Sequence, residues 1–115
     1  MLNVATGGGA KGLDLPSDWK ERIERFIGAP MRFGYGMSES LGGAMGCEAG
    51  NYHPPVSSIL FILDLETGDP LPREGTQTGR HAFLDLVVDS YWGGFVTGAK
   101  VTVTWDHCEC GRRGP

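Results

Sequence analysis

Residues 33–40, with the sequence FGYGMSES, combine the residue types that a nucleotide site needs. Glycines let the backbone approach a ligand closely or adopt a positive φ angle. The ring of Tyr35 offers a flat face for a purine, and the hydroxyl of Ser38 can donate a hydrogen bond to a phosphate oxygen. The carboxylate of Glu39 suits magnesium, which prefers hard oxygen ligands. The same residues would also suit a plain strand-end turn, with Ser38 as a helix N-cap and Glu39 in solvent. Residue types and spacing leave both interpretations open.

Three cysteines and one histidine form two pairs of potential metal ligands. Cys47 and His53 are separated by five residues, and Cys108 and Cys110 are separated by one. Three thiolates and one imidazole are a common ligand set for a closed, tetrahedral structural zinc site. The spacing therefore predicts a zinc ion that joins the segment after residue 40 to the end of the last strand and stabilises a small sheet.

Two alternatives to this zinc site stay open at the level of the sequence. The two pairs could be unrelated, with His53 in a turn before Pro54 and the Cys-x-Cys pair exposed to solvent. His107 could replace His53 as the fourth ligand, although a direct neighbour of Cys108 would reach the same ion with more backbone strain. The odd number of cysteines argues against a disulfide framework.

Length and charge restrict the class of protein. A chain of 115 residues is one domain at most, or part of a larger one. The net charge of −4 argues against nucleic acid as a partner, because nucleic acids bind basic surfaces. No apolar run approaches the roughly 20 residues that cross a bilayer, and the glycines at 7–9 interrupt any signal-peptide core. We therefore expect a cytoplasmic protein without a membrane span.

The first half of the chain is predicted to form an α/β unit. Residues 2–5 predict a short strand that leads into a glycine-rich turn, and residues 31–35 predict a second strand that leads into the motif at Tyr35. A helix between them makes a βαβ unit, in which ligands gather beyond the carboxyl ends of the strands. The glycine turn and Tyr35 are therefore expected at the same edge of the sheet.

The predicted helix has clear start and stop signals. Ser17 is the expected N-cap, and Gly28 is expected to end the helix. Between them, apolar residues from Trp19 to Ile27 recur at three- and four-residue spacing, Phe26 among them, and charged residues occupy the other side. We expect this apolar face to pack into the core as scaffold.

From residue 56 onward, short strands alternate with turns rich in Gly, Pro and Asp. Strands are predicted at residues 56–63 and 79–88, and residues 95–97 and 100–105 are predicted to supply one or two more. This pattern predicts a small antiparallel sheet or partial barrel. The fold class expected for the chain is thus α/β plus β. Its two parts would be a partial α/β nucleotide-binding subdomain at residues 1–55 and a small β subdomain at residues 56–115.

The motifs, taken in order, resemble the adenylate-forming acyl-CoA synthetase superfamily. They lie at residues 6–9, 35–39, 47–54, 66–72 and 110–112. Within this superfamily the chain looks most similar to the phenylacetate-CoA ligase branch and to the acyl-protein synthetases of bacterial luminescence. The likeness covers nearly the whole chain, and the ordered series is more specific than any single motif. It favours the nucleotide-site interpretation of residues 33–40.

The resemblance implies a role for each residue of the central motif. Tyr35 resembles the aromatic residue that stacks on adenine, and Gly36 and Met37 follow it in the same motif. Ser38 resembles the hydroxyl that contacts the α-phosphate, and Glu39 resembles the magnesium ligand. Ser38 and Glu39 would therefore be the catalytic residues.

Further positions match the family outside that motif. Gly7, Gly8 and Gly9 resemble the loop that contacts adenine and the acyl end of the substrate. Arg112 resembles the arginine near the ribose, at the hinge into a mobile C-terminal domain. In the phenylacetate-CoA ligase branch, the Cys and His positions look like a zinc site.

The implied reaction joins a carboxylic acid to ATP, which gives an acyl-adenylate and pyrophosphate, and then transfers the acyl group to a thiol such as CoA. Catalysis of this kind rests on placement and on charge neutralisation around the α-phosphorus. The implied cofactors are ATP or AMP and magnesium, with zinc in a structural role. The partners would be a small carboxylic acid and a thiol acceptor, and an aryl acid, a fatty acid and an acyl-protein route all remain open.

Two departures from the family pattern bear on activity. The family places an aspartate after Thr-Gly to hold the ribose hydroxyls, whereas here Thr97-Gly98 is followed by Ala99, whose methyl group cannot accept a hydrogen bond. Asp106 lies too far along the chain to replace it without a shift in register. The Ser/Thr/Gly-rich phosphate loop and the domain with the adenylation lysine are also absent.

We therefore expect a fragment of the large domain of such a ligase, which is inactive without the missing N- and C-terminal parts. One alternative is a non-catalytic, zinc-stabilised binding or structural module derived from the family. Another is a free-standing, β-rich protein-interaction domain, which would fold cooperatively on its own.

Overall fold

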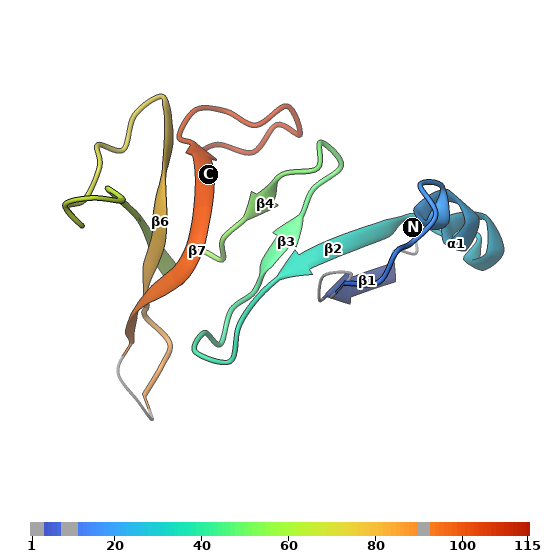
Figure 1. Cartoon of the computed structure of the whole chain (residues 1–115), viewed down its shortest axis with the longest axis horizontal. Helices are drawn as coiled ribbons and strands as arrows, with labels where there is room; N and C mark the ends of the chain where they lie inside the picture. Colours follow the sequence, from blue (N-terminus) through green and yellow to red (C-terminus); the bar gives the residue numbers. More distant parts are fainter. Residues whose placement is uncertain (1–3, 8–11, 90–92) are drawn as a thin grey trace.

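The computed structural model describes residues 4–7, 12–89 and 93–115 (Figure 1). Its strands form a four-stranded sheet with the order β1-β2-β3-β4 and a three-stranded sheet with the order β5-β6-β7. Strand pairing is mostly antiparallel, and there is one short helix. The elements are β1 (Val4–Gly7), α1 (Trp19–Ile27), β2 (Met31–Tyr35), β3 (Ala44–Gly46), β4 (Tyr52–His53), β5 (Ser58–Leu63), β6 (Thr76–Asp85) and β7 (Gly94–Thr104).

The first sheet begins with a parallel strand pair. β1 and β2 run in the same direction, α1 connects them, and Gly7 lies opposite Gly34. The carboxyl ends of both strands therefore lie at one edge of the sheet, next to Tyr35. β3 and β4 add two short antiparallel strands, which the sequence analysis did not identify. Gly8 and Gly9 lie outside the described residues.

The helix ends where the sequence indicated but begins differently. Gly28 adopts a left-handed conformation with φ of 72° and donates its N–H to the carbonyl of Glu24, as expected for a glycine that ends a helix. The N-cap is Asp18 and not Ser17, and no side chain caps the first turn. The Ser17 assignment was wrong because it relied on residue type, while the helical geometry starts one residue later.

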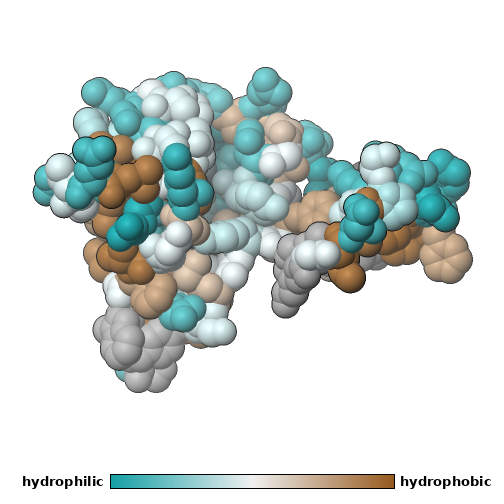
Figure 2. Space-filling model, in the orientation of Figure 1, coloured by the Kyte–Doolittle hydropathy of each residue, from teal (hydrophilic) through white to brown (hydrophobic). Residues whose placement is uncertain are grey.

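The apolar face of α1 is not part of a core. None of its residues is buried, and the side chain of Phe26 is 91% exposed. Trp19 makes an edge-to-face contact with Phe33, with ring centroids 5.7 Å apart. α1 lies at one end of the molecule, and Figure 2 shows hydrophobic side chains on the surface there. The predicted core packing of Phe26 was wrong because spacing reveals which face is apolar, but not whether another element covers it.

The second sheet is antiparallel, as predicted, and it contains most of the small core. Ile62, Ala82 and Phe83 are buried between its strands and the neighbouring segments. Residues 95–97 and 100–105, predicted to supply one or two strands, correspond to a single strand, β7, which has an irregularity in its middle. There Arg80 pairs with Lys100 and Ala82 pairs with Val96, so three residues of β7 lie opposite one residue of β6. A bulge of this kind bends a strand and redirects its side chains.

The turn predicted after β5 is held by a single carboxylate. Oδ1 of Asp64 accepts hydrogen bonds from the N–H groups of Glu66 and Thr67, at 2.8 and 2.9 Å. The N–H of Asp64 also donates to the carbonyl of Asp69. Asp64 thus organises a loop within the second sheet. In the part of the chain that the structure describes, no helix is long and apolar enough to cross a membrane.

Candidate metal centre

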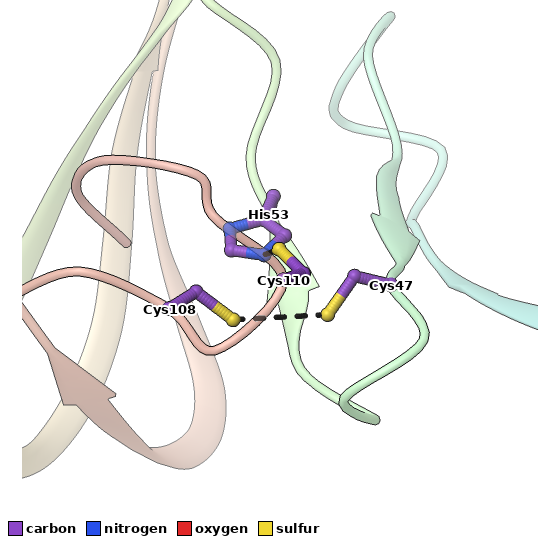
Figure 3. A group of neighbouring side chains, drawn as sticks. All are labelled: Cys47, His53, Cys108 and Cys110. Carbon is purple, nitrogen blue, oxygen red and sulfur yellow. Dashed lines mark hydrogen bonds between the residues drawn. The ribbon is translucent and has the colours of Figure 1, made fainter.

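The first cysteine lies in the tight turn between β3 and β4. The N–H of Cys47 donates to the carbonyl of Asn51 at 2.8 Å, and the N–H of Gly50 donates to the carbonyl of Cys47 at 3.1 Å. Gly50 has a φ of 82°, which only glycine adopts without strain. The turn therefore directs the Cys47 side chain toward the second sheet (Figure 3).

The other two cysteines lie in a turn of the same design after β7. The N–H of Cys108 donates to the carbonyl of Arg112, and the N–H of Gly111 donates to the carbonyl of Cys108, both at 2.9 Å. Gly111 has a φ of 87°, close to that of Gly50. The two turns read CEAGN and CECGR in the sequence, and this shared Cys-Glu-x-Gly pattern was the signal that the sequence analysis overlooked.

The two turns and β4 bring the four predicted ligands together (Figure 3). The ligand atoms of Cys47, His53, Cys108 and Cys110 all lie within 4.8 Å of one another. Sγ of Cys47 lies 3.8 Å from Sγ of Cys108, and Sγ of Cys110 lies 3.4 Å from Nε2 of His53. The cysteines are free thiols. This group could hold a metal ion, and the interpretation of two unrelated pairs does not describe it.

The distances fit the geometry of tetrahedral zinc. Zn–S bonds of about 2.3 Å and Zn–N bonds of about 2.0 Å at tetrahedral angles place two sulfurs about 3.8 Å apart, and a sulfur and a nitrogen about 3.5 Å apart. The separations between Cys47 and Cys108 and between Cys110 and His53 match these values closely. The other ligand-atom separations in the group are at most 4.8 Å.

Hydrogen bonds favour the thiolate form of two of the cysteines. Nδ2 of Asn51 lies 3.4 Å from Sγ of Cys108 and donates to it. This bond, together with the main-chain N–H of Cys110, lowers the pKa of Cys108 to about 6. Burial raises the pKa of Cys47, but hydrogen bonds from the main chain of Asn51 and from His53 outweigh burial and bring the pKa below its ordinary value. Metal ions bind the thiolate, so both shifts favour coordination.

The pKa values of the other two candidate ligands, His53 and Cys110, are raised. Burial lowers the pKa of His53, whereas the main chain of Pro115 and the thiols of Cys47 and Cys108 raise it, and the net effect is upward. A main-chain hydrogen bond lowers the pKa of Cys110, but burial and the neighbouring thiols raise it overall. A bound cation would hold the three thiols as thiolates and would need His53 in its neutral form.

His53, and not His107, is the fourth member of the group. The side chain of His53 is only 4% exposed, and its Nε2 faces Cys110. Its Nδ1 is buried and makes no hydrogen bond of good geometry, although the main chain of Pro115 is near enough to affect the pKa. His107 is exposed and lies outside the group.

The residues predicted to bind a nucleotide lie at the end of β2. The N–H of Ser40 donates to the carbonyl of Met37 at 3.2 Å, which closes a turn with Ser38 and Glu39 exposed at its tip. Tyr35 is half-buried and contacts two other rings. The centroid distances are 6.3 Å to Tyr52 and 5.9 Å to His81. The structure thus presents Ser38 and Glu39 to solvent, and their roles stay predictions.

Three further positions, Arg112, Ala99 and Asp106, were considered in relation to the ribose. Arg112 is exposed, and its carbonyl belongs to the second cysteine turn. Ala99 lies in the bulge of β7, where its N–H donates to Oγ1 of Thr97 at 3.0 Å. Asp106 is exposed beyond the end of β7. The aspartate expected to bind ribose therefore has no evident replacement among these residues.

A cavity of about 660 Å³ separates the two sheets and connects the motif at Tyr35 with the cysteine cluster. His81, Phe83 and Val101 line it from the second sheet. Its volume is in the range of small-molecule sites. The only sequence signal for His81 is the alternation of β6, which places it on the inner face of that strand.

Known proteins were compared with the whole chain. No family model matches it, and no curated protein matches it. Among solved structures, apo MatB from Rhodopseudomonas palustris matches with a TM-score of 0.57 and 21% sequence identity. The match covers 94% of this chain and 24% of the MatB chain. The chain therefore has the fold of a segment of MatB and spans about a quarter of MatB's length.

Proposed function

We propose that this chain is part of the nucleotide-binding domain of an ATP-dependent ligase that forms acyl-adenylates, with a structural zinc ion. MatB is an adenylate-forming acyl-CoA ligase, and the shared fold extends over 94% of the present chain. The ordered motifs of the sequence resemble the same superfamily. Fold and motifs thus support one origin by two separate lines of reasoning.

One observation carries the proposal. The parallel pairing of β1 and β2 places Gly7 opposite Gly34, so the glycine-rich segment and the Met37–Ser40 turn begin at the same sheet edge. We take β1, α1 and β2 as the βαβ edge of the adenylate-forming domain, in which ligands bind beyond the carboxyl ends of the strands. The exposed tip of this turn is where such a ligand would lie.

The exposed side chains of that turn suit a phosphate. In the proposed reaction, the hydroxyl of Ser38 donates a hydrogen bond to an α-phosphate oxygen. The carboxylate of Glu39 is the group that would hold magnesium, whose charge would offset the charge that develops on the phosphate oxygens. The acyl group would then pass from the adenylate to a thiol such as CoA.

The zinc ion would have a structural role. Cys47, His53, Cys108 and Cys110 supply four protein ligands, and such a closed set leaves no position for a substrate. The ion would join the β3–β4 hairpin to the segment after β7, which fixes one sheet against the other. The described core has few buried apolar side chains, so this cross-link would contribute much of the stability.

Binding of MgATP tests the proposal. The complete open reading frame that encodes these residues is expressed, and the affinity for MgATP is measured by calorimetry for the wild type and for Glu39→Gln. We expect Glu39→Gln to weaken binding by roughly tenfold or more, because a charged ligand of the cation is lost. Glu21→Gln, at an exposed position on α1, is the matched control and should stay within about twofold. Equal affinities for the wild type and Glu39→Gln would contradict the proposed role.

A second function is favoured by one specific observation. Ala99 occupies the position at which the resemblance expects a ribose-binding aspartate, and its methyl group cannot accept a hydrogen bond. This favours a non-catalytic, zinc-stabilised module derived from the family. Such a module would keep its zinc and show no MgATP binding in the same experiment.

A further inference from the structure

A buried carboxylate joins the second sheet to the turn that carries Ser38 and Glu39. Asp85, the last residue of β6, is only 4% exposed. Its Oδ2 accepts the N–H of Leu41 at 2.9 Å and lies 3.3 Å from Oγ of Ser40, which donates to it. These contacts connect residues more than 40 positions apart in the sequence. Ser40 and Leu41 lie in the loop between β2 and β3 of the first sheet, whereas Asp85 ends β6 of the second.

Both oxygens of this carboxylate are occupied. Oδ1 of Asp85 accepts a hydrogen bond from the N–H of Val87 at 3.2 Å, while Oδ2 accepts hydrogen bonds from Ser40 and Leu41. An asparagine would turn a donor NH₂ group toward one of these donor sets and could not satisfy all of them. Burial raises the pKa of Asp85, but the hydrogen bonds from Val87, Leu41 and Ser40 bring it below its ordinary value. The site therefore selects an ionised carboxylate.

The same face of β6 also contacts the motif before the turn. Residues four apart on a strand point to the same side, so His81 shares a face with Asp85. The ring of His81 lies edge-on to Tyr35, with 5.9 Å between centroids. β6 thus contacts the motif on both sides of the turn, at Tyr35 and at Ser40–Leu41, and leaves the tip between them free.

We propose that Asp85 is a positioning residue, which anchors the exit of the Met37–Ser40 turn on β6 and so sets the placement of Ser38 and Glu39. The anchoring follows from the hydrogen bonds alone. Its importance for a ligand rests on the proposed function, in which Ser38 and Glu39 face a nucleotide phosphate and its magnesium ion.

Amide hydrogen exchange of the zinc-loaded chain tests the anchoring without any ligand. We expect Asp85→Ala to raise the exchange rate of the Leu41 amide by roughly 10- to 100-fold, because hydrogen bonds to charged groups are among the stronger ones. Asp64→Ala removes a carboxylate that holds a different turn, and it should leave Leu41 unchanged. An unchanged Leu41 rate in Asp85→Ala, with zinc retained, would overturn the proposal.

A milder variant keeps the test usable if Asp85→Ala does not fold. Ser40→Ala removes only the hydroxyl that donates to Asp85 and to the carbonyl of Gly42. It should raise the exchange rate of the Leu41 amide by about 3- to 10-fold, because Asp85 loses one of the donors that hold its carboxylate in place. No change at this amide would count against the anchor.

The MgATP affinity of the same variants separates this proposal from the proposed function. If the wild type binds and Asp85→Ala weakens binding several-fold while Asp64→Ala does not, Asp85 positions the ligand-binding groups. If Glu39→Gln weakens binding and Asp85→Ala does not, the positioning role is wrong. If the wild type does not bind MgATP, the proposed function is wrong, and the exchange rate of Leu41 alone decides whether Asp85 anchors the turn.

Discussion

The two sheets are joined at two junctions of different chemistry. At the metal junction, defined by the four ligands Cys47, His53, Cys108 and Cys110, soft ligands from three segments converge within 4.8 Å. At the carboxylate junction, Asp85 accepts hydrogen bonds from Ser40 and Leu41. A bound cation would neutralise the thiolates of the first, whereas the second is complete within the chain. We infer that the metal junction fixes the two sheets against each other and that the carboxylate junction sets the direction of the Met37–Ser40 turn.

The two junctions also differ in what surrounds them. The metal junction lies between two cysteine turns with exposed glycines at Gly50 and Gly111. The carboxylate junction lies next to the core of the second sheet, because Asp85 follows the buried Phe83 on the same strand, β6. Loss of the ion should therefore have a larger effect on the structure than loss of the carboxylate.

The largest expected effect is on zinc affinity when a ligand is removed. His53→Ala should lower the affinity by well over 100-fold, because even the loss of a residue that only orients a ligand costs about 10- to 100-fold. His107→Ala is the matched control, since it removes an exposed imidazole next to Cys108 and should stay within about twofold. Competition with a chromophoric chelator measures both variants. Similar losses for the two would show that the fourth ligand has been misassigned.

The two junctions should also differ in the pH at which acid disrupts them, which is a smaller effect than the loss of a ligand. Hydrogen bonds hold the pKa of Asp85 in the folded chain below its unfolded value of about 3.9. Asp85 therefore contributes its full stabilisation of the fold above pH about 3.9, and this stabilisation is lost as the pH falls through the lower pKa of the folded state. Protons compete with zinc for the thiolates and for His53, so the metal should leave at higher pH. We expect zinc release first, and a change in the Leu41 amide chemical shift only below about pH 4.

Release of the turn together with zinc would contradict this separation, because the two junctions would then form one cooperative unit. Asp85→Asn provides the control for the second step. Its amide side chain does not titrate, so the change in the Leu41 shift below about pH 4 should be absent.

Much of the fold could be predicted because it depends on local signals. Gly28 ends α1 as a left-handed residue, Asp64 opens a turn, and β2 has the predicted bounds. The grouping of the four candidate metal ligands could also be predicted from their residue types and their distribution along the sequence. Each of these features is specified by residues close together or by chemistry that few residue types offer.

The remaining features depend on contacts between distant segments. β3 and β4 have three and two residues, too few for an alternating pattern to be recognised. Asp85 resembles any polar residue at a strand end until the fold brings Leu41 against it. The apolar spacing of α1 correctly indicated an amphipathic helix, but the exposure of Phe26 is a tertiary property that spacing does not contain.

X-ray absorption at the zinc edge, on the chain purified without chelator, tests the metal junction most directly. We predict one zinc ion per chain, with three sulfur ligands at about 2.3 Å and one nitrogen ligand at about 2.0 Å. That result would establish Cys47, His53, Cys108 and Cys110 as a closed structural site. Less than about 0.2 zinc per chain, or a shell made of oxygen and nitrogen alone, would contradict the account.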